Sequence, residues 1–345
     1  MAGKPSITLS VSARILVNTE ALNMAESVGN VTRHRRAPIV VGDQGRYWIV
    51  YVPAVSGESI AHHYQRLLAS IAASMNLPVT KMDLAGYFLK YSSDDIIKKY
   101  YPEVSSVLNL KDVCQVEEEL VRASVVADVT GFLYTEKLVK RTSRIRFSYL
   151  VPALDAVKHG AATGYPQFHT RYSPGAAREE QALYYVESGS SLYSLSTVLN
   201  VSDISELEYC GDSQRISKIA SEKPKRVHAA LEALLALLDG MIFGAKRSRY
   251  LPQWEVKSLV ATVSKGPVEF VVSPSVNPNY AEQTARRATA IAKHLGSNIR
   301  IFLYDSEGLT ISSEYSHTIS RYGSHTEALK AAIDEALKAI SSGGT

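Results

Sequence analysis

Three runs of this chain alternate apolar and polar side chains over nine to eleven residues. They are ITLSVSARILV at 7–17, RIRFSYLVP at 144–152 and SLYSLSTVL at 191–199. A period of two in segments rich in β-branched residues predicts strands that bury one face. A sheet of such strands must be covered by a second layer, which helices can supply. Further strands are predicted at 39–52 (a hairpin around GDQG), 255–263, 268–272, 299–304 and 309–316.

Helical patterns occur between these strands. Ser56 is a suitable N-cap for a helix over 57–75, and Pro224 and Gly240 bound a helix over 225–239. Other helices are predicted at 113–127, with Glu117 to Glu119 facing solvent, and at 280–295 and 326–340, whereas 128–134 has an extended pattern. We therefore predict an α+β fold, compatible with an RRM-like (ferredoxin-like) core with an antiparallel sheet, in a single domain spanning 1–345.

Two insertions are expected in this core. Residues 76–112 are polar and rich in Tyr, with Pro78 and Pro102, and predict an inserted helical or irregular region. Residues from about 160 to 190 predict a projecting hairpin, whose turn is Ser173-Pro174-Gly175. Alternation places Gln167, His169 and Arg171 on one face of this hairpin. An amphipathic hairpin of this kind can also pack on its own domain.

Basic residues gather in a few acid-poor segments. Between Ser27 and Gly42 the sequence VGNVTRHRRAPIVV has no acidic residue, and basic segments also occur at 137–146, 223–226 and 246–249. Guanidinium groups and free backbone N–H groups match the geometry of phosphates. Net charge is only +4, so a nucleic-acid surface would have to come from clustering. Basic loops interleaved with His and Tyr favour single-stranded nucleic acid, and the alternative is a set of solvated loops.

Composition and motifs limit the other classes of function. Two cysteines are too few for a disulfide framework or a cysteine-based zinc site and are typical of a reducing compartment. The start MAGKPSITLS lacks a signal pattern, and no apolar run approaches the roughly 20 residues of a membrane span. A cytoplasmic protein is expected. Dinucleotide, P-loop, zinc-protease and nucleophile-elbow motifs are absent, so no cofactor or metal is expected.

Several stretches together resemble one family. They are RILVNTEALNMAESVGNVTRHRRAPIVV, VPAVSGESIAHHYQ, ADVTGFLY, VKRTSRI, QFHTRY and GAKRSRYLP, and they span roughly 12–255. This set is similar to the CRISPR-associated DevR family of the RAMP superfamily, the crRNA-binding backbone subunit of archaeal subtype I-A Cascade. The last ninety residues resemble the family only in their strand–helix pattern.

The resemblance implies a non-catalytic subunit for antiviral defence. Copies would polymerise along the crRNA into a helical filament, contact other Cascade subunits and present the guide to target DNA. A thumb hairpin would kink the guide, with 160–190 as the candidate and 76–112 as its rival. The RNA-binding residues implied are Asn23, Asn30, Arg33, His34, Arg36, Ser56, Gly57, His62, Arg141, Arg144, His169, Arg171, Lys246, Arg247 and Arg249.

Two other functions are considered. Related backbone subunits of type III complexes cut RNA with an acidic residue in the loop after the first strand, but here the loop from Ser27 to Gly42 has none. Glu26 and Asp128 are expected to serve structure, and His34 with His62 could act as acid and base without a metal. A sequence-specific DNA regulator, which the family name implies, lacks a recognisable helix-turn-helix.

Overall fold

The computed structural model describes residues 5–171, 182–210, 218–240, 243–244 and 246–342. Its main sheet has ten strands. They are β1 (Ser6–Glu20), β2 (Met24–Val28), β3 (Val31–His34), β8 (Ile145–Phe147), β9 (Val151–Pro152), β10 (Ala162–Arg171), β11 (Ala182–Asn200), β12 (Gln253–Gly266), β13 (Asn298–Asp305) and β14 (Ile319–Tyr322). Two smaller pairs are β4 (Arg36–Asp43) with β5 (Arg46–Pro53) and β6 (Phe132–Tyr134) with β7 (Val139–Arg141).

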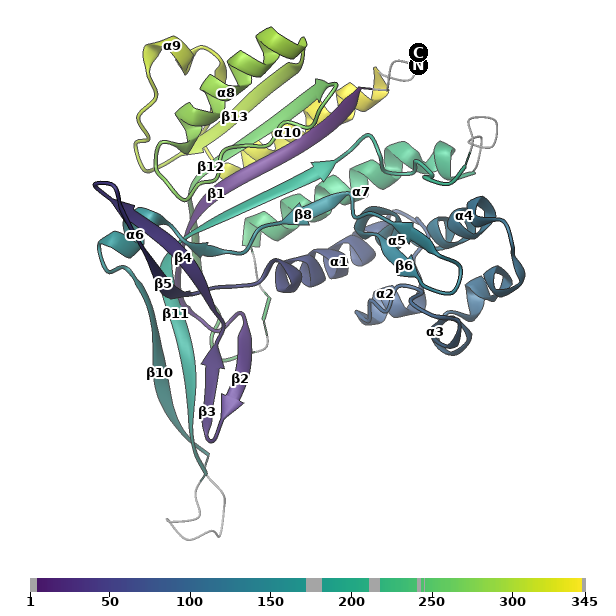
Figure 1. Cartoon of the computed structure of the whole chain (residues 1–345), viewed down its shortest axis with the longest axis horizontal. Helices are drawn as coiled ribbons and strands as arrows, with labels where there is room; N and C mark the ends of the chain where they lie inside the picture. The colour runs from purple at the N-terminus through teal and green to yellow at the C-terminus, as the bar shows by residue number, and fades with distance from the viewer. Residues whose placement is uncertain (1–4, 172–181, 211–217, 241–242, 245, 343–345) are drawn as a thin grey trace.

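The main sheet has the order β14–β13–β12–β1–β11–β3–β2, and β8, β9 and β10 also pair with β11 (Figure 1). Among the described residues, two pairs of this sheet are parallel, β3 with β11 and β13 with β14, and the others are antiparallel. The helices are α1 (Gly57–Ser74), α2 (Lys81–Ala85), α3 (Asp94–Tyr100), the 3₁₀ helix η1 (Pro102–Asn109), α4 (Val113–Ala123), α5 (Val125–Thr130), α6 (Leu154–Lys158), α7 (Lys218–Gly240), α8 (Tyr280–Leu295), α9 (Ser313–Ser316) and α10 (His325–Ser341). The predicted α+β class with a mostly antiparallel sheet is confirmed.

Strand β1 is buried on both faces, and its alternation separates two kinds of contact. Its odd-numbered residues, such as Leu9 and Val11, join the core beneath α1, α7 and α10 (Figure 1). On the other face, Ser10, Ser12 and Arg14 are polar and buried, and they contact the segment before α8. Ser10 Oγ accepts from the amide of Val272 at 3.1 Å, and Ser12 Oγ accepts from the amide of Ser275 at 3.0 Å. The strand predicted at 268–272 is wrong, because this segment forms no strand and the amide of Val272 bonds to a side chain of the sheet face.

Strand β11 joins two regions of the molecule. Its first half pairs with β10 as a hairpin that projects from the sheet, and its second half lies beside β1 (Figure 1). The sequence predicted two strands here, and the structure makes them one of 19 residues. The predicted turn at 173–175 lies outside the described residues.

Residues from about 78 to 141 form a helical lobe with its own core, on the side of the molecule away from the hairpin (Figure 1). Cys114 on α4 and Cys210 form a disulfide within this core. The sequence analysis did not anticipate this disulfide, and with it the cysteine content no longer argues for a reducing compartment. Glu117 is also buried, not solvated, because its carboxylate accepts from the amides of Glu208 and Tyr209.

Three smaller expectations are also wrong. Pro224 lies inside α7, because the helix begins earlier, at Lys218, where Ile219 packs into the lobe core. Asp128 belongs to α5, not to an extended run. The strand predicted at 309–316 is replaced by a turn, in which Asp305 accepts from three amides, and by α9. Across the described residues, the longest apolar helical stretch is too short or too polar to cross a membrane.

Candidate nucleic-acid interface

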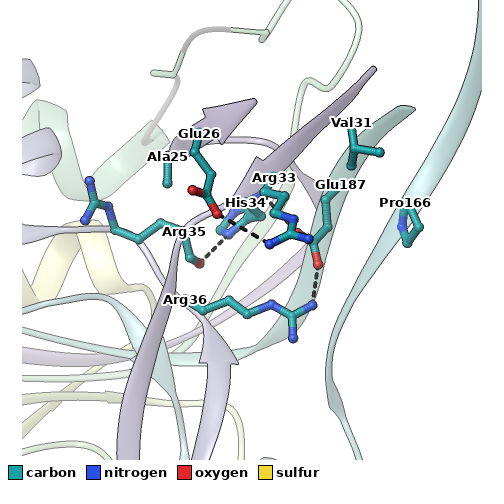
Figure 2. Close-up of a pocket in the computed structure, with 9 residues that line it drawn as sticks. All are labelled: Ala25, Glu26, Val31, Arg33, His34, Arg35, Arg36, Pro166 and Glu187. Carbon is teal, nitrogen blue, oxygen red and sulfur yellow. Dashed lines mark hydrogen bonds and ion pairs between the residues drawn. The ribbon is translucent and has the colours of Figure 1, made fainter. Parts of the chain in front are cut away.

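The first basic segment lines a cavity of about 660 Å³ between β2, β3, β10 and β11, which we call the RHRR cavity (Figure 2). Its lining residues are Ala25, Glu26, Val31, Arg33, His34, Arg35, Arg36, Pro166 and Glu187. Strand β3 pairs with both β2 and the first half of β11, so it brings Arg33 here, and the chain continues directly into Arg35 and Arg36 at the start of β4. The same pairing brings two carboxylates into the cavity.

His34 is the buried floor of the RHRR cavity. Its Nε2 lies 2.7 Å from the Glu20 carboxylate and its Nδ1 lies 2.8 Å from the carbonyl oxygen of Arg35. Burial alone would lower the pKa of His34, but the hydrogen bond and charge of Glu20 outweigh it and raise that pKa above its ordinary value. Tyr193 also donates to Glu20, at 2.9 Å. His34 is therefore held by a buried network, which leaves it no free ring nitrogen for RNA.

The arginines of the RHRR cavity already have partners in the chain. Arg36 pairs with Glu187, and Arg33 lies 3.5 Å from Glu26 with both side chains more than half exposed (Figure 2). Arg35 turns away and donates to Asn23 Oδ1 at 2.9 Å. The positive charge of RHRR is thus largely balanced by carboxylates.

Several predicted site residues position the start of α1. Asn23 Oδ1 also accepts from the amide of Ser56 at 3.0 Å, and Ser56 Oγ accepts from the amide of Ser59 as the N-cap. Residue 57 must be glycine because a Cβ there would lie 2.7 Å from the carbonyl oxygen of Phe147 and would clash with it. Asn30, in the β2–β3 turn, donates to the carbonyl oxygen of Leu183 at 3.2 Å. These residues therefore make contacts within the chain.

The structure places Arg141 and Arg144 in the interior. Arg141 is 3% exposed and forms ion pairs with Glu117 and Asp128, and Arg144 is 7% exposed and lies 2.8 Å from Glu208. Burial alone would raise the pKa of Asp128, but the charges of Arg141 and Arg226 outweigh it and lower that pKa. The central basic run therefore ties the helical lobe to α7 and does not supply these two arginines to an open surface.

The loop between α7 and β12 forms a different kind of basic surface. It separates two cavities, of about 420 Å³ and 560 Å³, which share Ser248. We call their combined linings the acid-free surface, because no carboxylate lines either cavity within the described residues. A Cβ on Gly244, whose φ is +104°, would lie 2.8 Å from Leu22 Cα, so glycine allows this loop to pack against the β1–β2 connection.

On the hairpin side of the loop, the acid-free surface is aromatic. His169 stacks on Tyr184 with ring centroids 5.2 Å apart and contacts the Tyr250 hydroxyl. Arg249 donates to the Tyr184 hydroxyl at 2.8 Å, and Lys246 also lines this cavity. Aromatic rings beside cations suit the bases and phosphates of single-stranded RNA. The side chain of Arg171, at the end of β10, lies outside the described part of the structure.

On the α1 side, the acid-free surface contains predicted and unpredicted residues. His62 and Arg247 were predicted, whereas His63 and Arg66 were missed. Arg66 follows His62 by four positions, so helix periodicity could have placed the two together. Tyr184 and Tyr250 were missed as well, and only their aromatic chemistry beside basic residues signals them. No group of three potential metal ligands occurs in the described ranges.

Comparison with known proteins shows the family. A family model described as "CRISPR-associated negative auto-regulator DevR/Csa2" matches residues 11–285. Two relatives from Saccharolobus solfataricus are named "CRISPR-associated protein Cas7/Csa2 1" and "CRISPR-associated aCascade subunit Cas7/Csa2 2". The first is 41% identical over 75% of this chain and 80% of its own length, and the second 36% identical over 88% and 94%.

Solved structures add a likeness in fold. A chain of a "CRISPR RNA-guided surveillance complex" has a TM-score of 0.50 and 10% identity, and the match covers 95% of this chain and 99% of that one. Identity this low bears on the fold alone. The match of the family model to most of the chain, together with relatives above 30% identity, shows that this protein belongs to the DevR/Csa2 (Cas7) family of CRISPR-associated proteins.

Proposed function

We propose that this protein is a crRNA-binding backbone subunit of a Cascade-type surveillance complex, and that the crRNA lies on the acid-free surface. The observation that carries this proposal is that the two cavities adjoin at Ser248, one beside α1 and one beside the hairpin, with cations and aromatic rings and no carboxylate in their described lining. Single-stranded RNA needs both phosphate neutralisation and stacking. The names of the relatives, which include a Cascade subunit, support the same function.

The order of elements supports an RRM-like core for this subunit. Taking β1, α1, β8 with β9, β11, α7 and β12 in sequence gives the βαββαβ series of that fold. Their neighbours in the sheet are β12–β1–β11–β8/β9, with every pair antiparallel. The helical lobe would then be an insertion after α1. The β10–β11 hairpin would be an insertion before the third core strand, and we assign the thumb to it because it projects.

An apolar face supports contact with further copies of the chain. In the β4–β5 hairpin, cross-strand pairing places Val40 with Ile49 and Pro38 with Tyr51 on the same face as Tyr47. Tyr47, Ile49 and Tyr51 are 76%, 63% and 69% exposed. Apolar patches of this kind mark interaction surfaces. Replacing Tyr47 and Ile49 by Ser should shorten the assemblies formed on a long RNA, measured by analytical ultracentrifugation, without weakening single-site RNA binding.

We further propose that the subunit holds RNA and target together without cutting either strand. The carboxylates and histidine that could catalyse cleavage are engaged: Glu26 with Arg33, Asp128 with two buried arginines, and His34 with Glu20. His34 and His62 line different cavities, and both ring nitrogens of His34 have partners in the chain. A target DNA would be read by pairing with the guide.

The test uses a fluorescently labelled single-stranded RNA and purified protein. Binding should depend weakly on sequence, and log K should fall with log salt with a slope of roughly 3 to 4 in magnitude if about four to six phosphates are neutralised. The same RNA, incubated with Mg²⁺ or Mn²⁺, should remain intact. Salt-independent binding would contradict the electrostatic site, and cutting at regular positions would assign the protein to the nucleases.

A further inference from the structure

The cavity on the α1 side of the loop is lined by basic and imidazole side chains. Its volume of about 560 Å³ falls within the usual range for small-ligand sites. Three segments line it: residues 22–24 at the β1–β2 connection, one face of α1, and loop residues 243–244 and 247–248. The first segment contributes no charge, α1 contributes His62, His63 and Arg66, and the loop contributes Arg247. We call it the α1 cavity.

The charges of the α1 cavity are all of one sign. Arg66 is exposed and has no ion pair or hydrogen bond among the described residues. The acid nearest in sequence on α1, Glu58, is exposed and does not line the cavity, and Lys246 faces the other cavity of the acid-free surface. Unlike the RHRR cavity, this one has no carboxylate in its described lining. A charge excess of this kind attracts an anion.

Ring contacts position the imidazoles of His62 and His63 in the α1 cavity, beside Arg66 and Arg247. His63 stacks on Phe243, with ring centroids 5.1 Å apart and an interplanar angle of 27°, and His62 meets the edge of Phe88 at 5.2 Å. Burial and the charges of Arg66, Arg247 and His62 lower the pKa of His63 to about 4. Burial and the charge of Arg66 also lower the pKa of His62. Both rings are therefore neutral near pH 7 in the RNA-free protein.

We propose that the α1 cavity is a proton-coupled phosphate site: a phosphodiester of the bound RNA lies between Arg66 and Arg247, and His63 takes up a proton from solvent as it binds. The bound phosphate would offset the positive charges that disfavour the imidazolium, and the imidazolium would in turn donate to a phosphate oxygen. This inference rests on the proposed RNA-binding function and adds two residues, His63 and Arg66, that sequence patterns did not identify.

The direction of the pH dependence follows from linkage. If RNA raises the pKa of His63 above its free value of about 4, the complex binds more protons than the free protein between the two values. RNA affinity should therefore rise as the pH falls from 8 towards 5. Net uptake cannot exceed one proton for each histidine that responds.

The experiment measures RNA binding by titration calorimetry at pH 6, in two buffers that differ in ionisation enthalpy. A labelled-strand assay from pH 5 to pH 8 accompanies it. The variants are His63→Gln and Arg66→Gln, with His294→Gln and Lys293→Gln on α8 as matched controls, since these exposed residues lie on another helix. Melting temperatures show whether each variant is folded.

The wild-type protein should take up a measurable fraction of a proton, and His63→Gln should lose most of that uptake. Arg66→Gln should weaken binding about tenfold, as expected for loss of a charged phosphate contact, and the α8 variants should behave as wild type. RNA binding that is unchanged in Arg66→Gln, or proton uptake that is unchanged in His63→Gln, would overturn this inference and leave the proposed function standing. If the wild-type protein binds no RNA, the proposed function fails and this inference fails with it.

Discussion

The RHRR cavity and the acid-free surface start from similar sequences and end with opposite electrostatics. Both come from short basic runs with no acid among their neighbours in the chain. In the RHRR cavity, Arg36 pairs with Glu187 of β11, which is far away in the sequence. His34 pairs with Glu20, which lies at the end of β1. Around the α7–β12 loop, no described lining residue is acidic. Absence of acids along the chain therefore does not predict absence of acids in space.

Sheet pairing explains this difference. Strand β3 is hydrogen-bonded between β2 and β11, so its side chains share a surface with those of two other strands. The α7–β12 loop is held by packing of Gly244 against the β1–β2 connection and faces α1 and the hairpin, whose nearby residues are His, Arg and Tyr. A basic segment inside a sheet acquires acidic partners from neighbouring strands, whereas the described lining beside this basic loop contains no carboxylate.

The largest effect is expected where carboxylates pair with basic residues that are completely buried, as they do at Arg141. Arg141→Ala should destabilise the protein by about 3–5 kcal/mol, because Glu117 loses its buried counter-charge and Asp128 keeps only Arg226. The neighbouring Lys140, which is exposed, provides the control, and Lys140→Ala should change stability by less than about 0.5 kcal/mol.

Chemical denaturation measures the free energy of unfolding of Arg141→Ala and Lys140→Ala. RNA binding by the folded fraction of Arg141→Ala should equal that of the wild type. Equal stability of the two variants would mean that the buried network contributes nothing, and loss of RNA binding without loss of stability would return Arg141 to the RNA site.

The second-largest effect is expected on RNA affinity, when charges on the acid-free surface are reversed. Reversing Lys246 and Arg247 to Glu should weaken RNA binding roughly 100-fold, since two phosphate contacts become repulsive, with the melting temperature nearly unchanged. Lys293→Glu with Lys330→Glu makes the same change in net charge on α8 and α10 and should have a much smaller effect. A loss of similar size in the control would show that net charge, not this surface, governs binding.

Sequence patterns predicted the scaffold better than the site. The bounds of strand β1 and helices α1, α8 and α10 were predicted to within a few residues. Each of these elements packs against another layer, and this contact gives its sequence a clear apolar periodicity. Segment 268–272 was misassigned because the amide of Val272 bonds to the buried Ser10 side chain of β1, which an apolar sequence pattern does not reveal. Glu117 and Arg141 were taken as surface residues because each looks solvated until its partner, 24 positions away, is known. The cysteine pair, 96 residues apart, has no local signal either.

A smaller effect is expected in the RHRR cavity. Changing Arg33 and Arg36 together to Glu should weaken RNA binding less than tenfold, because their carboxylate partners already offset most of their charge. Fluorescence anisotropy with the RNA used for the loop variants gives a direct comparison. If this pair loses as much affinity as Lys246 with Arg247, the RNA must displace Glu187 and Glu26, and the two regions do not differ in the way the ion pairs imply.

The smallest expected effect is a gain of affinity. Glu187→Gln removes a negative charge from the RHRR cavity while retaining an oxygen that can accept from the amide of His34, which Glu187 now does at 3.0 Å. Arg36 would lose an ionic partner and become more available to a phosphate. RNA binding should therefore strengthen about two- to threefold at low salt, and the gain should shrink as salt screens the cavity. Glu335→Gln, which removes an Arg-paired glutamate on α10, is the matched control and should leave affinity unchanged. Weaker binding in Glu187→Gln would mean that Glu187 orients Arg36 for RNA and does not compete with it. In that case the RHRR cavity would be an organised part of the interface, as its sequence first indicated.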